Sequence, residues 1–105
     1  MAEQRIYIAG KITGLPRAVY QHNFEVAEDR LKRKDYVVVN PVKMIAGIGE
    51  TVFTYDEIMR VCLAALKTCD AIYLTKGWED SRGAKIEKAE ALNHGLISLD
   101  RKSVV

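Results

Sequence analysis

The sequence of residues 69–87 is Cys-Asp-Ala-Ile-Tyr-Leu-Thr-Lys-Gly-Trp-Glu-Asp-Ser-Arg-Gly-Ala-Lys-Ile-Glu. Ala71–Leu74 is a short apolar run, which predicts a strand that is covered on both faces. The Lys-Gly pair that follows is a turn signal that ends this strand. Ser81 or Asp80 can cap the helix that comes next. The stretch therefore predicts a compact unit of strand, turn and helix start.

Glu87 lies at a position of this helix where packing alone does not predict a carboxylate. Gly83, Ala84, Glu87 and Ala91 repeat at three- and four-residue spacing, so they share one helix face. The three small residues predict close packing on the sheet. A carboxylate on such a face is costly to desolvate unless it is paired, hydrogen-bonded or open to a cleft. Two interpretations stay open: Glu87 serves a site, or the helix is rotated and Glu87 is an ordinary surface residue.

Signals for strands and helices alternate along the rest of the chain. Further strands are predicted at Arg5–Ala9, Tyr36–Val39 and Leu96–Leu99, the second of them buried on both faces. Helices are predicted from about Ala18 to Lys34 and after a capping box at Thr54–Glu57. Met44–Val52 is predicted as a loop that can include a short helical turn, and Asp100–Val105 as a short or frayed tail. We therefore expect one domain, residues 1–105, with a three-layer α/β/α, flavodoxin-like (Rossmann-like) parallel sheet of about four strands in the order 2-1-3-4.

In a sheet of this order, ligands bind beyond the carboxyl ends of the strands, at the switch point between strands one and three. Gly10 ends strand one, and it either lets the backbone approach a ligand or simply forms a tight loop. Asn40, held extended before Pro41, either caps the next turn or touches a ligand. Tyr7 either hydrogen-bonds Glu87 or fills the core.

Composition and charge exclude several classes of function. The net charge of +2 is small and the basic residues are dispersed, which argues against a nucleic-acid surface. The chain lacks a signal-peptide pattern and a membrane-length apolar run, so we expect a cytoplasmic protein with no membrane partner. Cys62 and Cys69 are expected to be buried free thiols, and no motif predicts a metal or a cofactor.

Three short motifs follow one another along the chain: Tyr7-Ile8-Ala9-Gly10, then Asn40-Pro41, then Cys69-Asp70-Ala71 leading to Ser81-x-Gly83-x-x-x-Glu87. With them, most of the chain resembles the nucleoside 2-deoxyribosyltransferase-like superfamily, in its small bacterial and phage branch. The resemblance implies that Glu87 attacks the anomeric carbon of a nucleoside or nucleotide. The base then leaves, and water or a second base resolves the glycosyl ester.

The chain also departs from the transferases of that superfamily. Ser81 stands where they carry an aspartate, and it resembles the phosphate-binding serine of related 2-deoxynucleoside 5-monophosphate N-hydrolases. With Arg82 beside it at a helix amino terminus, an anion site is expected there. A second aspartate of the transferases falls near Arg60, so the acid that protonates the base is unassigned among Asp56, Glu79 and Asp80.

The turn before this helix, from Gly77 to Gly83, is expected to border the same crevice. Trp78 in it is either a stacking platform for the base or a plug that packs under the turn. The leading hypothesis is thus an enzyme acting on an N-glycosidic bond, and the alternative is a protein that binds a nucleotide-derived ligand without catalysis. Relatives complete their sites from a neighbouring subunit, so a homo-oligomer is expected.

Overall fold

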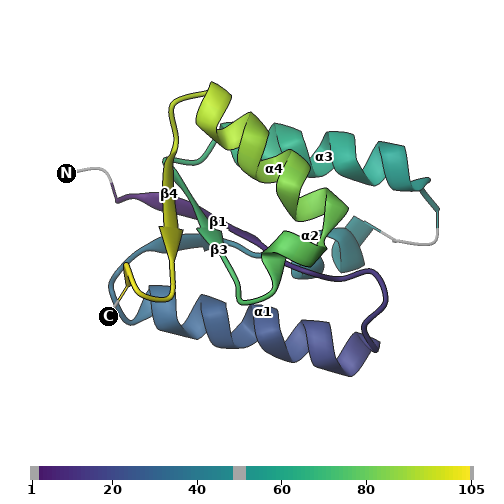
Figure 1. Ribbon diagram of the computed structural model, residues 1–105, viewed down its shortest axis with the longest axis horizontal. Coiled ribbons are helices and arrows are strands. Elements are labelled where there is room, and N and C mark those ends of the chain that lie inside the picture. The colour runs from purple at the N-terminus through teal and green to yellow at the C-terminus, as the bar shows by residue number, and fades with distance from the viewer. Residues whose placement is uncertain (1–2, 49–51, 105) are drawn as a thin grey trace.

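The computed structural model of the chain describes residues 3–48 and 52–104, which form a parallel sheet between two layers of helices (Figure 1). The strands are β1 (Arg5–Ala9), β2 (Val37–Val39), β3 (Ala71–Leu74) and β4 (Ile97–Asp100). The helices are α1 (Arg17–Lys32), α2 (Pro41–Ile48), α3 (Tyr55–Lys67) and α4 (Arg82–Asn93), with a short 3-10 helix, η1, over Trp78–Asp80. The predicted three-layer α/β fold is confirmed.

Within the described residues the sheet has four parallel strands in the order β2-β1-β3-β4, as the sequence predicts. Tyr7 in β1 pairs with Val39 on one side and with Ile72 on the other. All of β3 and all of β1 after Arg5 are buried. Strands covered on both faces must be apolar throughout, which is why these two were found without ambiguity.

The edge strands differ from their predictions. Strand two begins at Val37, and its expected burial on both faces is wrong, because Val37 is 38% exposed and the next two valines are half-buried. An edge strand has a neighbour on one side only, and the apolar run could not reveal that place in the order. Strand four, at the other edge, begins at Ile97 and extends to Asp100.

Side chains alternate between the two faces of β1, so separate cores form above and below the sheet. Ile6 and Ile8 pack with Phe24 of α1. Tyr7 and Ala9 face the other way, toward buried residues of α3 and α4: Cys62, Leu66, Ala84 and Ala91. Figure 1 shows α1 below the sheet and α3 with α4 above it. Glu87 of α4 therefore belongs to the layer that Tyr7 faces.

The segment Met44–Val52 was predicted as a loop with at most a short helical turn, but it is helical as far as Ile48, because α2 already begins at Pro41; residues 49–51 lie outside the described part of the chain. Asn40 starts this helix, since its Oδ1 accepts hydrogen bonds from the backbone N–H groups of Val42 (3.1 Å) and Lys43 (3.4 Å). Proline suits the first helical position, which needs no N–H. These starting signals outweigh the low helix propensity of Gly47.

The segment after β4 is short, and it is not frayed as far as Val104; Val105 lies outside the described part of the chain. Residues 101–103 form a turn in which the backbone N–H and the hydroxyl of Ser103 both donate to the Asp100 carboxylate, at 2.9 and 3.0 Å. The turn brings Val104 into the core on the α1 side of the sheet, where it is 6% exposed. The two hydrogen bonds and the buried valine hold the segment, and a single apolar residue gives no periodic signal.

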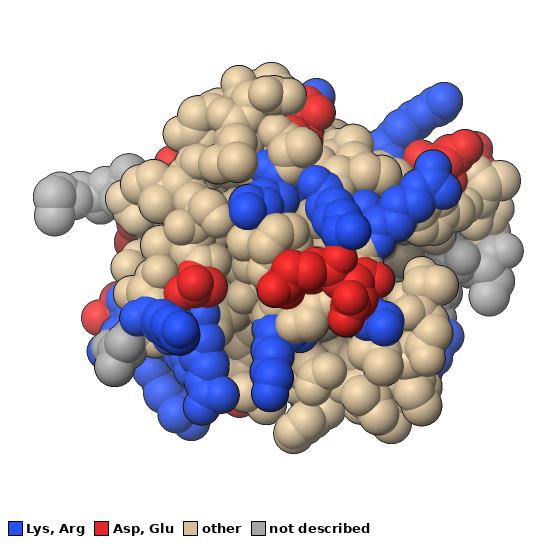
Figure 2. Space-filling model, viewed as in Figure 1, with Lys and Arg blue, Asp and Glu red and all other residues tan. Residues whose placement is uncertain are grey.

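Charged side chains of both signs share the face shown in Figure 2, where acidic side chains lie between basic ones in the middle of the view. A surface of mixed sign creates only a weak overall field. Among the described helices, none combines the length and the apolar composition that crossing a membrane requires.

Candidate functional site

A cavity of about 200 Å³ opens at the carboxyl end of β1, between residues of α1 and α2 and residues of α3 and α4. Its walls come from the loop after β1, from α1, α2 and α3, and from the start of α4. Most of the lining side chains are apolar, as in most small-molecule sites. Of the described residues that line it, Glu87 is the only one with a carboxylate, and none is a lysine, arginine or histidine.

Glu87 is 7% exposed and lines this cavity from α4, between the buried residues Ala84 and Ala91 of the same helix face. Its Oε2 accepts a hydrogen bond from the hydroxyl of Tyr7, which is fully buried in β1. The predicted helix face and the proposed contact between these two residues are both confirmed. The surface interpretation of Glu87 is therefore wrong.

The surroundings of Glu87 raise the pKa of its carboxyl group toward neutral pH. Burial raises its pKa to about 7, and the hydrogen bond from Tyr7 lowers the pKa but offsets the burial only in part. Burial, and then the charge of Glu87, raise the pKa of Tyr7 well above its usual value. Tyr7 therefore stays a hydrogen-bond donor while Glu87 alternates between its acid and carboxylate forms near pH 7.

Cys62 of α3 lines the same cavity beside this pair. The sequence predicts it as a buried free thiol, which is confirmed, as is the same prediction for Cys69. Burial raises the pKa of Cys62 to about 11, so the thiol is neutral and a poor nucleophile at physiological pH. The chemistry of the cavity thus rests on its carboxylate.

Ser81 begins α4 and lines the cavity at the end of the same helix that carries Glu87. Its Oγ accepts a hydrogen bond from the backbone N–H of Ala84 at 3.1 Å, so it is the N-cap that the sequence allowed. A hydroxyl that accepts as a cap keeps its own proton to donate. Ser81 can therefore offer a donor to a ligand without giving up its place in the helix.

Two glycines allow the close approaches that shape the cavity. A Cβ at Gly83 would lie 3.2 Å from the hydroxyl of Tyr55 and 3.6 Å from the sulfur of Met59, so glycine lets α3 and α4 come together. A Cβ at Gly10 would collide with the hydroxyl of Thr75, which follows β3. Gly10 is therefore needed where the ends of β1 and β3 meet.

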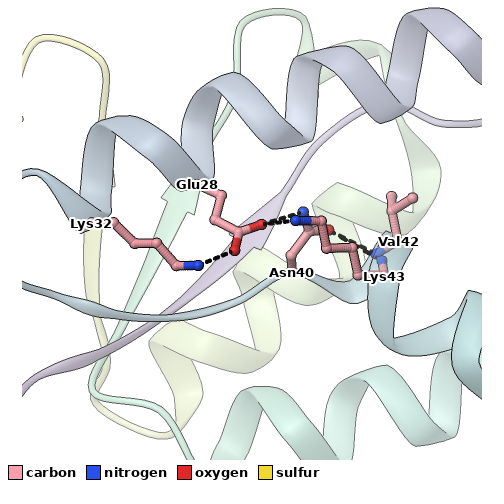
Figure 3. Close-up of polar contacts among 5 residues, drawn as sticks. All are labelled: Glu28, Lys32, Asn40, Val42 and Lys43. Atoms are coloured by element: carbon pink, nitrogen blue, oxygen red, sulfur yellow. Dashed lines mark hydrogen bonds and ion pairs between the residues drawn. The ribbon is translucent and has the colours of Figure 1, made fainter.

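Asn40 does not line the cavity. Besides capping α2, its Nδ2 donates a hydrogen bond of 3.0 Å to Glu28, and Glu28 also pairs with Lys32 at 2.6 Å and Lys43 at 3.0 Å (Figure 3). Burial raises the pKa of Glu28, but the hydrogen bonds from Lys32, Asn40 and Lys43 outweigh it and lower the pKa to about 2. Of the two predicted roles of Asn40, helix capping is confirmed. Its hydrogen bond to Glu28 joins α2 to α1.

Three other predicted ligand-binding residues also lie outside the cavity lining. Gly77 has φ +87° and supplies the left-handed turn before η1. Trp78 is half-buried against the core of the α4 layer, and the Nζ of Lys88 lies 4.4 Å from its ring centroid. Arg82 is exposed on the first turn of α4. For Trp78, the packing interpretation fits these contacts.

Sequence reasoning missed the side of the cavity that α3 and α1 provide. Tyr55, Met59 and Cys62 of α3 line it, as does Tyr20 of α1. The three-four spacing of the α3 residues was a sufficient signal that they share a face, and it was interpreted as core packing. Periodicity identifies a face that avoids water, but it cannot distinguish a core from a cavity wall.

A protein-family model described as a domain of unknown function (DUF4406) matches residues 4–98. The chain belongs to this family. The match to DUF4406 begins just before β1 and continues into β4, so it includes the cavity and the Tyr7–Glu87 contact. No curated protein matches the chain. Within residues 3–48 and 52–104, no three His, Cys, Asp or Glu side chains gather closely enough to hold a metal ion.

Proposed function

We propose that the chain is a cytoplasmic enzyme similar to the nucleoside 2-deoxyribosyltransferases, which cleaves or transfers the N-glycosidic bond of a (deoxy)nucleoside or its 5-monophosphate. The observation that carries the proposal is the buried carboxylate of Glu87, which lines a cavity and is held by Tyr7. A carboxylate has a high desolvation cost in such a place, and perturbed carboxylates in clefts concentrate at functional sites.

In the proposed reaction, an Oε atom of Glu87 attacks the anomeric carbon while the bond to the base breaks. The bonding electrons leave with the base, and a glycosyl ester with Glu87 remains. Water or a second base then attacks the same carbon and releases the carboxylate, as in retaining glycosidases. Tyr7 orients the carboxylate and favours its ionised form, which is the form that attacks.

The size of the cavity bears on how the substrate is held. Ligand pockets usually enclose about 300 Å³ or more, whereas this one encloses about 200 Å³. We propose that it holds the sugar, that Ser81 and Arg82 meet a 5-phosphate at its rim, and that the base lies near Tyr20 and Tyr55. A phosphate at the amino terminus of α4 would gain from the helix dipole and from Arg82.

A homo-oligomer is part of this proposal, because the rim of the cavity exposes apolar surface. Ile12 is 38% and Tyr55 45% exposed, and both line the cavity. A second copy over the rim would cover them and enclose the substrate more fully. Light scattering at micromolar concentration tests this part: we expect a dimer or larger assembly, and a monomer contradicts it.

The central test is release of free base from a panel of nucleosides and their 5-monophosphates. We expect turnover by the wild type, none by Glu87→Ala, and normal turnover by Glu90→Ala, a matched change on the same helix. A 2-fluoro sugar analogue should add mass to the peptide that contains Glu87. Turnover by Glu87→Ala at the wild-type rate contradicts the proposal.

A second candidate function is binding of a nucleotide-derived ligand without catalysis. It is favoured by the absence of a second carboxylic acid among the described residues of the cavity lining, since no carboxyl group other than Glu87 is then there to protonate the departing base. Calorimetry run beside the turnover assay separates the two. Saturable binding of a nucleotide by the wild type with no base release supports the binding protein and contradicts the enzyme.

A further inference from the structure

A second cavity lies on the α1 side of the sheet, between α1, the end of β3 and the turn after β4. It encloses about 420 Å³, roughly twice the volume of the cavity at Glu87. Four side chains that line it carry or can carry positive charge, and they come from three separate segments: His22, Arg30, Lys76 and Arg101. No carboxylate side chain is among the described residues that line it.

Arg30 is held in place at this cavity. Its Nη1 donates a hydrogen bond of 3.2 Å to the hydroxyl of Tyr73, a residue of β3 that is 2% exposed. The guanidinium is half-buried and therefore loses little further freedom when it binds a ligand. Tyr73 accepts in this bond, so its own hydroxyl proton remains as a donor.

Neutral donors stand among the cations. The hydroxyl of Thr75 and the amide of Asn23 line the cavity, with Val26 and Ala27 of α1 between the polar groups. The nearest acidic residue in sequence to Arg101 is Asp100, and its carboxylate is already engaged by the backbone N–H and hydroxyl of Ser103. Figure 2 shows basic side chains over the C-terminal turn and the adjoining part of α1, at the lower left of the view, with an acidic side chain beside them.

We propose that this second cavity binds a small phosphorylated anion, such as pyrophosphate or the phosphate group of a sugar phosphate. Its volume falls in the range of about 300–1,000 Å³ that small-molecule sites occupy. Arginine recognises phosphate oxygens through two parallel N–H bonds, and lysine adds a point charge. Because the cations converge on a hollow instead of spreading over a face, a compact anion fits them better than a polymer does.

This site is distinct from the cavity at Glu87. Gly10 lines the first cavity and Thr75 lines the second, and the two residues touch where β1 and β3 end. The two cavities share no residue among the described ones that line them. Binding in the second does not depend on any catalytic role of Glu87.

The test is calorimetric titration of the full chain with pyrophosphate and with ribose 5-phosphate, together with amide NMR spectra. We expect saturable binding of at least one probe, with the largest shifts at Thr75 and Lys76. The double variant Lys76→Ala/Arg101→Ala, which changes exposed residues, should bind about tenfold more weakly or worse. Arg30→Gln should weaken binding similarly, and circular dichroism checks that each variant is folded.

The control double variant Lys85→Ala/Lys102→Ala removes the same charge outside the cavity and should bind like the wild type. Equal losses in both double variants would show a response to overall charge and overturn the proposal. The proposal is also overturned if neither pyrophosphate nor ribose 5-phosphate binds saturably. Weaker binding of the probe by Arg82→Ala would place the anion at α4 and would also overturn the proposal. Tighter binding of a single-stranded oligonucleotide than of pyrophosphate would overturn it as well.

Discussion

The hydroxyl of Tyr7 donates a hydrogen bond to the carboxylate of Glu87, a residue 80 positions later in the chain. The contact joins the central strand β1 to α4, and both residues are buried where it forms. Without Tyr7, the carboxylate would lose the hydrogen bond that favours its charged form. The pair therefore sets both the position of the carboxylate and the pH range in which it is ionised.

Tyr7→Phe should raise the pKa of Glu87 further, because only the hydrogen bond from Tyr7 is lowering it against burial. A hydrogen bond to a charged group contributes about 1.5–3 kcal/mol, which corresponds to a pKa rise of about one unit or more. Carbon NMR of the labelled glutamate carboxyl groups measures this without a substrate. Tyr73→Phe, on the other face of the sheet, is the control and should leave the titration of Glu87 unchanged. Identical titrations in wild type and Tyr7→Phe contradict the prediction.

Gly10→Ala should destabilise the protein by about 1–3 kcal/mol, the usual cost of forcing a methyl group into a packed site. The new Cβ collides with the hydroxyl of Thr75, so the ends of β1 and β3 must separate. Urea denaturation measures the loss. Adding Thr75→Ala removes the hydroxyl and should restore part of the stability. If Gly10→Ala is as stable as the wild type, the two strand ends are not as close as the structure has them.

The central part of this fold could be predicted from the sequence because burial on both faces leaves no room for ambiguity. Ala71–Leu74 and Arg5–Ala9 are apolar at almost every position, and the right-handed crossover rule reduced the plausible strand orders to a few, among them the flavodoxin-like order that the sheet has. The buried face of α4 was predictable for a related reason: small residues at Ala84 and Ala91 bracket Glu87. These features depend on local pattern alone.

The remaining features depend on contacts that local pattern does not contain. Asn40 was expected either to cap or to touch a ligand, and its bond to Glu28 decides where its amide points. The place of Trp78 is set by the left-handed turn at Gly77 and by its contact with Lys88 of α4. The cavity itself is bounded by residues of four helices and of the loop after β1, and no spacing of apolar residues within one element encodes a space between several.

Glu28→Gln should destabilise the protein near neutral pH and have little effect in acid. The pKa of Glu28 is lowered to about 2, so its charged form stabilises the fold above its usual value of 4.5, and this contribution is lost as the pH falls from 4.5 to about 2. Its lysine partners are largely exposed to solvent, so we expect a loss of about 2 kcal/mol at pH 7. Denaturation at pH 7 and at pH 2 measures it, with the exposed Glu25→Gln on the same helix as control. Equal losses at both pH values contradict the prediction.

Glu87→Gln should have the opposite pH dependence. The folded state raises the pKa of Glu87 from 4.5 to about 7, so it binds the proton more tightly than the unfolded chain does. The wild type therefore loses stability as the pH rises from 4.5 to about 7, by on the order of 3 kcal/mol at about 1.4 kcal/mol per pKa unit. Glutamine keeps the shape and an acceptor for Tyr7 but never ionises. The variant should match the wild type near pH 4.5 and be more stable at pH 8, as measured by urea denaturation.

Glu90→Gln is the control: hydrogen bonding to His94 lowers the pKa of Glu90, so that variant should not gain stability at pH 8. If the difference in unfolding free energy between Glu87→Gln and the wild type stays constant from pH 4.5 to pH 8, Glu87 titrates as an ordinary glutamate. The raised pKa of Glu87 would then be wrong.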